Sequence, residues 1–409
     1  MDSSPGIRGS LTALGRAGLA VTAANVAANL LAYLAPVLGA RRLDPAGLGA
    51  LAAALALVAI ATMPGVGLQT AAAVAVARSG ARVPVARPAW LTALACGGAV
   101  LAGTPVLAAA LRLPLAVPPL LAAMTVPAVL AGWPLGVLQG SERFGRLAAG
   151  TVLLAAGRYA GVLAGLAAGT GPAGAFALGA LVAWLLPPAL WWLLRSSPAE
   201  TPAEPVTTAP AGALRGRAVF AAASASLAIL VASYADLILA RRLLPPGESG
   251  AYAVGAVLTR AALWAPQVIT IVALPRLVRG GAVLRIGLAL VAAAGAVLAG
   301  GAALTGDRLV RAVGGTRYAG LGGLAPYFVL VGALYAVTVF LINALIADGA
   351  RRPAVGVWAV IAVLVVVVAA VRPDTVGHLL ACAAGAAAAS ALATGAAVWR
   401  RQRAFTSAR

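Results

Sequence analysis

The sequence predicts an all-α polytopic membrane protein, with twelve transmembrane helices in two six-helix bundles that are related as parallel repeats. Hydrophobic residues make up 62% of the 409 residues and charged residues only 10%, whereas soluble domains contain about 25% charged residues. Uninterrupted apolar runs of about 20 residues, each long enough to cross a bilayer, recur along the chain. A motif of Arg and Gly also occurs twice, about 200 residues apart, which indicates two related halves.

Each copy of this motif separates two apolar runs. The first copy reads Ala40-Arg41-Arg42-Leu43, then Asp44-Pro45, then Gly49-Ala50. The second copy reads Ala240-Arg241-Arg242-Leu243, then Pro245-Pro246, then Gly250-Ala251. Because each copy ends one apolar run and begins the next, each is expected to form the tight turn of a transmembrane hairpin.

Six apolar runs in each half are the predicted spans. In the first half they are expected at residues 17–40, 47–77, 89–111, 114–139, 147–169 and 173–194. In the second half they are expected at residues 218–240, 250–274, 283–304, 324–346, 354–371 and 376–398. The segment between the halves is rich in Pro, Ser, Thr and Ala, which is typical of a flexible linker. The predicted domains are an N-terminal six-helix lobe (1–194), a cytoplasmic linker (195–217) and a C-terminal six-helix lobe (218–409).

The arginines predict the orientation of the chain in the membrane. All 30 basic residues are Arg and, with the N-terminus in the cytoplasm, nineteen fall in cytoplasmic segments and nine on the other side. This excess follows the positive-inside rule and predicts that both termini are cytoplasmic. The dominance of Ala, Gly and Arg is typical of a GC-rich bacterial genome, so we expect a multi-pass protein of the bacterial cytoplasmic membrane. The topology accounts for the net charge of +20, and no nucleic acid is expected as a partner.

Polar residues on one face of the first span are candidates for a substrate cavity. Thr22, Asn25, Asn29 and Tyr33 follow one another at steps of three, four and four, which places them on one side of a helix. Two interpretations stay open. The side chains either form hydrogen bonds with neighbouring helices or line a water-filled cavity.

Two arginines inside predicted spans are the main candidates for a substrate site. Arg158 falls in the middle of the fifth span and Arg260 in the outer half of the eighth. An arginine at a helix centre costs about 2.5–3.5 kcal/mol on insertion scales. Trp264 and Gln267 extend the face of Arg260 along its helix. Each arginine is therefore expected to face an aqueous cavity or an acidic partner, and Asp236 is the only other charge well inside a span. One carboxylate cannot neutralise two guanidinium groups.

Asp236 also lies close in sequence to the outer pair Arg241-Arg242, so an interfacial ion pair is the favoured interpretation for this residue. No cluster of His, Cys or acidic residues predicts a metal site or an active site. Without Lys there is no phosphate-binding loop of the ATPase type. We therefore expect no cofactor and no enzymatic activity, and we expect a monomer.

Several short motifs resemble the polysaccharide flippases of the MATE/MOP superfamily (Wzx-type lipid-linked oligosaccharide exporters). In the first half these are the first Arg-Arg turn with Gly49, then Gly67-Leu68-Gln69-Thr70, and Gln139-Gly140-Ser141-Glu142-Arg143-Phe144 continuing to Arg158-Tyr159. In the second half they are Asp236-Leu237-Ile238-Leu239, Gly250-Ala251-Tyr252, Leu274-Pro275-Arg276, Asn343-Ala344-Leu345 and Gly349-Ala350-Arg351. The resemblance covers most of the chain, and each motif is short.

The resemblance implies two six-helix bundles around a central cavity that opens alternately to each side. It also implies an anionic cargo, a saccharide linked to polyprenyl pyrophosphate, with membrane lipids and glycan-assembly proteins as partners. Arg158 or Arg260 would bind the pyrophosphate, since the planar guanidinium group can bind phosphate oxygens in a bidentate manner. The chain departs from lipid II flippases in having few charges in its first two spans.

Three other functions stay open. A cation-coupled drug antiporter of the same fold would be expected to carry acidic residues deep in the N-terminal half, and spans one to six contain none. A membrane-embedded glycosyl polymerase or ligase would need a large outer loop with acid and base residues. A membrane scaffold without transport activity is the fourth reading.

Overall fold

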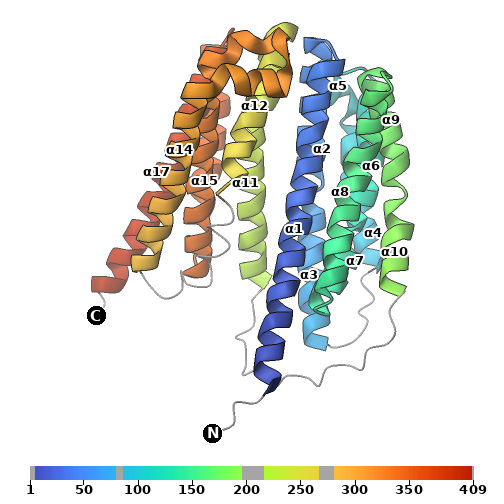
Figure 1. Cartoon of the computed structure of the whole chain (residues 1–409), viewed down its shortest axis with the longest axis vertical. Coiled ribbons are helices and arrows are strands. Elements are labelled where there is room, and N and C mark those ends of the chain that lie inside the picture. The colour runs from blue at the N-terminus through green and yellow to red at the C-terminus, as the bar shows by residue number, and fades with distance from the viewer. Residues whose placement is uncertain (1–4, 80–85, 196–215, 267–280, 408–409) are drawn as a thin grey trace. The chain divides into compact units, whose positions relative to one another are not determined.

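The structure is a computed structural model that describes residues 5–79, 86–195, 216–266 and 281–407. Within these ranges the chain is helical and contains no strand. In the first half the helices are α1 (Pro5–Arg42), α2 (Pro45–Ala61), α3 (Met63–Ser79), α4 (Ala86–Ala102), α5 (Thr104–Leu111), α6 (Val117–Leu130), α7 (Gly132–Gly140), α8 (Phe144–Ala167), α9 (Gly171–Ala183) and α10 (Leu186–Arg195). In the second half they are α11 (Gly216–Leu243), α12 (Pro246–Trp264), α14 (Gly281–Gly314), the 3₁₀ helix η1 (Thr316–Leu324), α15 (Ala325–Ala347), α16 (Val355–Val371) and α17 (Val376–Ser407) (Figure 1).

Each of the twelve predicted spans coincides with one helix or with two consecutive helices. Among the described residues, nine helical segments are long and apolar enough to cross a membrane, and the bent pair α4–α5 raises this number to ten. Of the other two spans, α16 is an apolar helix of 17 residues. The last, α12, carries Glu248 and Arg260, and the residues after Pro266 lie outside the description. The helical membrane fold is therefore confirmed.

Proximity divides the chain into two compact units. The first unit comprises Met1–Leu38, Ala61–Ala109 and Leu113–Ala213. The second unit comprises Gly39–Ile60, Ala110–Arg112 and Leu214–Arg409. The predicted lobes were defined by counting spans, whereas these units are defined by contacts in one conformation. The units therefore do not test the lobe boundaries, which stay a prediction. Most of the predicted linker, residues 196–215, lies outside the described residues.

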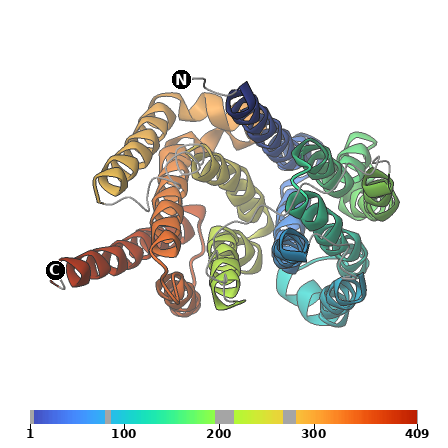
Figure 2. The same ribbon diagram turned by 90° about the horizontal axis from the view of Figure 1, so that it is seen from below.

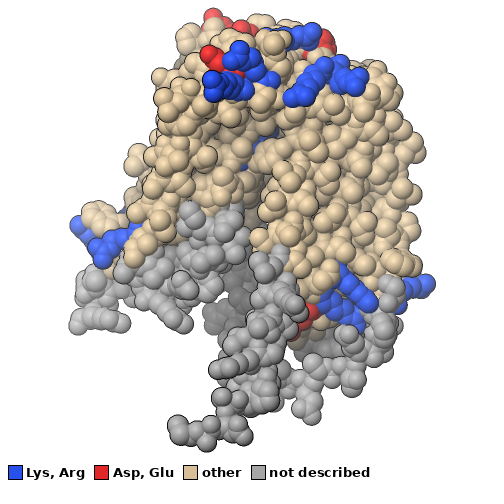
Figure 3. All heavy atoms as spheres, viewed as in Figure 1, with Lys and Arg blue, Asp and Glu red and all other residues tan. Residues whose placement is uncertain are grey.

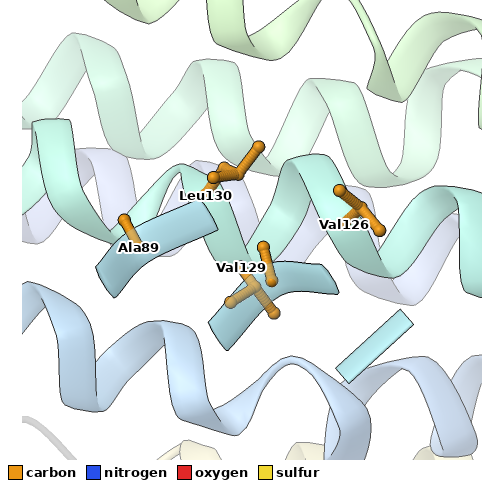
Figure 4. Packing of buried hydrophobic residues seen from close by; sticks show 5 residues of the cluster. Ala89, Val126, Val129 and Leu130 are labelled. Carbon is orange, nitrogen blue, oxygen red and sulfur yellow. The ribbon is translucent and has the colours of Figure 1, made fainter. Parts of the chain in front are cut away.

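The first unit is held together by small apolar clusters, each between two or three helices. Ala89 and Ala93 of α4 pack against Val126, Val129 and Leu130 of α6, and all five side chains are buried (Figure 4). A second cluster joins helices α7, α8 and α10. Alanine side chains on one helix and branched side chains on its neighbour let the two backbones approach closely, as in many membrane helix pairs.

A ridge of glycines on α8 packs against the two helices that follow it. The glycines at steps of four fit against α9 and α10: a Cβ atom added at Gly157 would meet Leu186, at Gly161 the backbone of Leu178, and at Gly165 Ala175. The fourth member of the series, Gly169, ends the helix with a positive φ of 72°, the conformation that favours glycine at a helix C-terminus.

A second glycine ridge, on α7, packs against α3. A Cβ atom added at Gly132 would collide with the carbonyl oxygen of Gly65, and one added at Gly136 would collide with that of Gln69. Gln69 and Gln139 are also joined by a side-chain hydrogen bond of 2.9 Å. The backbones of α3 and α7 therefore approach closely, and this face has no room for larger residues.

In the second unit, α15 is the central helix. It packs against α12, α14 and α17 (Figure 2), and most of its residues are buried on all sides. A helix that is apolar around its circumference is typical of such a central position. The hydroxyl of Thr259 on α12 donates to the carbonyl oxygen of Phe328 on α15, which fixes α12 against this core.

On the face shown in Figure 3, the visible arginines gather near helix ends, and the surface between them carries almost no charge. An uncharged band of this kind is what a lipid-facing surface requires. The composition, the helix lengths and this band together indicate a multi-pass membrane protein.

Candidate functional site

Two clusters of polar side chains lie among the apolar helices, one in each unit, and they are described separately. In the first unit, Arg158 lies near the middle of α8, as predicted. One of its terminal nitrogens, Nη2, donates to Oγ1 of Thr62 over 3.2 Å. Thr62 is buried and occupies the break between α2 and α3, where two residues later Pro64 cannot donate a backbone hydrogen bond.

The contacts of Arg158 are with neutral groups. Its guanidinium carbon lies 5.7 Å from the centroid of the adjacent ring of Tyr159, and its Nε is buried without a hydrogen-bond acceptor. Within the described part of the chain, no carboxylate lies within ion-pair distance of this residue. The cluster therefore retains a positive charge and an unused donor at the depth of the helix centre.

The polar face of α1 is present, but its two asparagines are exposed and are not packed against a neighbouring helix. Asn25 and Asn29 are exposed, and the amide of Asn25 donates to the carbonyl oxygen of Val21 in its own helix. Tyr33 is half-buried. Among the described residues, neither asparagine forms a hydrogen bond with another helix, which was one of the two interpretations of this face.

In the second unit, Asp236 of α11 is 2% exposed. The hydroxyl of Tyr252 on α12 donates to its Oδ2 over 2.8 Å, and the backbone N–H of Leu237 donates to its Oδ1 over 2.8 Å. Tyr252 is itself held edge-on against the ring of Phe328, with centroids 5.2 Å apart. Burial of a polar group is tolerated when it is hydrogen-bonded in this way.

Arg260 completes this second cluster. Its guanidinium carbon lies 4.1 Å from the centroid of the Tyr234 ring, a cation–π contact that can contribute about 2 kcal/mol when desolvated. Its Nε and Nη2 are buried and donate to no acceptor among the described residues. The charge of Arg260 acts on Asp236 electrostatically, without an ion pair within 4 Å. Two guanidinium donors thus stay unused beside a buried carboxylate.

The structure corrects the partner expected for Asp236. Neither Arg241 nor Arg242 pairs with it, because they follow it by five and six residues and helical geometry turns them about 140° and 240° away. The nearby phenol of Tyr252 takes that place.

Of the remaining predicted site residues, Trp264 lies at the end of α12 and is 36% exposed. It is one turn beyond Arg260 and has no hydrogen bond to the cluster. Gln267 lies outside the described residues.

Sequence reasoning missed the three tyrosines of the second cluster. Tyr234 and Tyr252 belong to the same hairpin as Asp236, and their spacing could have indicated a shared site. Tyr335 is 3% exposed on α15 and is an electrostatic neighbour of Asp236. It falls within a continuous apolar run about 100 residues away along the sequence, so no local signal points to it.

The donors present do not form a metal site. Among the described residues, no group of three or more His, Cys, Asp or Glu side chains could hold a metal ion. What the first cluster can do is donate hydrogen bonds to an anion. The second can do the same through Arg260, and it can also exchange a proton or attract a cation through Asp236.

Comparison with known proteins finds no matching family model and no matching curated protein. Two solved structures share the fold. One is described as the inward-facing conformation of a multidrug resistance MATE family transporter of the MOP superfamily, with 14% identity, 92% of this chain and 94% of that chain covered, and a TM-score of 0.67. The other is the eukaryotic MATE transporter AtDTX14, with 14% identity, 93% of both chains covered and a TM-score of 0.58. The chain therefore has the fold of these transporters, twelve helices in two six-helix halves.

Proposed function

We propose that a chain with this fold moves a lipid-linked saccharide across the cytoplasmic membrane by alternating access, with the pyrophosphate of the cargo bound by Arg158. The carrying observation is that this guanidinium group lies at the centre of α8, bonded only to the neutral hydroxyl of Thr62 and without an acidic partner among the described residues. A charge is expensive at this depth, and an anion is the ligand that offsets the cost.

Arg260 is the second binding group in this proposal. Two nitrogens of Arg260 and the Nε of Arg158 are buried donors without an acceptor among the described residues. Phosphate oxygens can accept hydrogen bonds from such donors. Asn25 and Asn29, exposed on α1, suit the hydroxyl groups of a sugar. The proposal places both termini in the cytoplasm, following the distribution of arginines.

The test is a flipping assay in proteoliposomes with a fluorescent disaccharide on polyprenyl pyrophosphate. We expect Arg158→Ala to lower the rate about 10- to 100-fold, which corresponds to the loss of a charged hydrogen bond. Arg158→Lys should retain part of the rate, since Lys keeps the charge without the planar fork. Arg308→Ala, at an exposed position of α14, is the matched control and should behave as the wild type.

Two results would contradict the proposal. If the unaltered protein leaves the lipid unmoved, the cargo is wrong. If the lipid moves at the same rate in the Arg158→Ala protein, this residue has no part in binding. Folded protein is to be quantified for every variant by fluorescence-detected size exclusion, so that a rate is compared only between equally folded samples.

A cation-coupled antiporter for organic cations is the second candidate, and the buried carboxylate of Asp236 favours it. The first of the two structural neighbours is described as a multidrug resistance transporter. This candidate predicts that proteoliposomes exchange ethidium for protons or sodium ions, and that Asp236→Asn stops the exchange. Flipping of the saccharide lipid without ethidium exchange would favour the first proposal instead.

A further inference from the structure

Four arginines in the second unit form a reciprocal set of hydrogen bonds to backbone carbonyls, which we call the arginine clasp: Arg41, Arg112, Arg241 and Arg317. Two of them come from the repeated Arg-Arg turns. The other two come shortly after α5 and α14. These helices end the third predicted span of the first and of the second half. The proposed transport function uses none of these residues.

The first pair of contacts starts at the turns. Arg41, in the first turn, donates through Nη2 to the carbonyl oxygen of Ala312 near the end of α14, over 2.9 Å. Arg241, in the second turn, donates through Nε to the carbonyl of Leu111 at the end of α5, over 2.8 Å. Each turn therefore binds the end of the third span of the opposite half, as a two-fold repeat requires.

The second pair of contacts runs in the reverse direction. Arg112, directly after α5, donates to the carbonyl oxygen of Leu244 in the second turn, over 3.2 Å. Arg317, shortly after α14, donates to the carbonyl oxygen of Leu43 in the first turn, over 3.2 Å. The acceptors are carbonyls at helix C-termini, where the partial charge is negative and no intrahelical partner exists.

Arg241 is the centre of the clasp. It is 6% exposed and makes three further contacts, with the carbonyl oxygens of Arg112 at 2.8 Å and Ala46 at 3.0 Å and with Oγ of Ser249 at 3.4 Å. Arg112 has a positive φ of 49°, and this conformation ends α5 and leaves its last carbonyls free to accept.

The glycines of the repeated motif bring the two turns together. A Cβ atom added at Gly49 would lie 2.5 Å from Oγ and 3.3 Å from Cβ of Ser249. One added at Gly250 would collide with the carbonyl oxygen of Pro45. The motif thus supplies two arginines that reach across and two glycines that let the first turns of α2 and α12 touch.

We propose that the arginine clasp is a gate, which closes one end of the transport path and opens in each cycle. This inference rests on the proposed alternating access. The acceptors described above are all neutral oxygens, and Arg112 and Arg241 are like-charged neighbours, with Asp44 nearby. Such bonds hold the turns together without the cost of separating an ion pair. The turn between α11 and α12 lies at the end of the second unit away from the C-terminus of α17 (Figure 1).

The test uses a disulfide as a measure of closure. The pair Gly49→Cys and Ser249→Cys is introduced after Cys96 and Cys382 are replaced by Ala. The Cβ separation of 3.3 Å is a few tenths of an ångström below the range of native disulfides, about 3.5–4.5 Å. The rate of disulfide formation with a mild oxidant is followed by thiol counting and by mass spectrometry of the linked peptides.

The chain offers its own matched controls. Arg42 and Arg242 carry the same charge one position further on, are exposed, and take no part in the hydrogen bonds of the clasp. We expect Arg41→Gln with Arg241→Gln to slow disulfide formation about tenfold, since several charged hydrogen bonds are lost. Arg42→Gln with Arg242→Gln should leave the rate unchanged. If the Arg241 variant does not fold, Arg112→Gln with Arg317→Gln, both at exposed positions, performs the same test.

Equal rates in the clasp and control variants would overturn the clasp. A second measurement tests the gate: the oxidised protein should no longer move cargo, and a reductant should restore transport. If the oxidised protein still transports, the turns need not separate and the gate is wrong. The disulfide rate requires no cargo, so it tests the clasp even if the proposed saccharide lipid is not transported.

Discussion

Leucine in place of Gly136 is expected to abolish the accumulation of folded protein. The Cα of this residue faces the backbone of Gln69 so closely that a Cβ atom would collide with its carbonyl oxygen and press on the methyl group of Ala72. A backbone cannot yield as a side-chain end does, so α3 and α7 would have to separate along their whole contact. Overpacking of this kind costs about 1–3 kcal/mol where neighbours can move, and more where they cannot.

The same substitution at Gly98 is the control. This glycine lies on α4, where a Cβ atom would meet nothing within 4 Å, so Gly98→Leu should accumulate as the unaltered protein does. Gly136→Ala should fall between the two. Fluorescence-detected size exclusion of detergent extracts gives the measurement. A monodisperse Gly136→Leu protein at normal level would mean that the α3–α7 contact is not as close as described.

Removing either charge of the second cluster is expected to cost about 1–3 kcal/mol of unfolding free energy, because polar groups that are buried in this cluster then lose a partner or a compensating charge. The variants are Asp236→Leu and Arg260→Met. Asp236 is almost fully buried and acts on Arg260 electrostatically. In the double variant both charges are gone, so its cost should be about 1–3 kcal/mol smaller than the sum of the single costs.

The measurement is reversible unfolding of the purified protein in mixed detergent micelles. A control cycle on Asp348 and Arg401 uses an ion pair of 2.8 Å whose side chains are 42% and 38% exposed. Its coupling should stay below about 1 kcal/mol, since solvent screens exposed pairs. Additive costs at Asp236 and Arg260 would show that their charges do not compensate each other.

The spans could be predicted because membrane thickness fixes helix length, and the apolar runs report it directly. The ridge on α8 is also visible in the sequence, because glycines four residues apart lie on one helical face. The ridge on α7 has the same spacing in the sequence, but its partner does not. Gly65 lies about 70 residues earlier, and nothing in either segment indicates that they meet.

The site was predicted in part, and its errors have a geometric cause. Arg158 and Arg260 stand out because a charge within an apolar run needs a reason. The partner of Asp236 was assigned by nearness in sequence, which ignores the rotation of a helix. The phenol of Tyr252, sixteen residues away, lies across the hairpin instead. The contacts of the repeated turns could not be predicted either. Every residue has a backbone carbonyl, so the type of the accepting residue does not indicate such a hydrogen bond.

The reach of Arg41 sets an order of events during synthesis. Its acceptor, Ala312, lies 271 residues later in the chain, and ribosomes add roughly 5–20 residues per second. The first hairpin is therefore made about 14 to 54 seconds before its acceptor carbonyl. During that interval Arg41 lacks the acceptor that it has in the complete chain, so this contact of the first turn forms only after the chain has been made as far as Ala312.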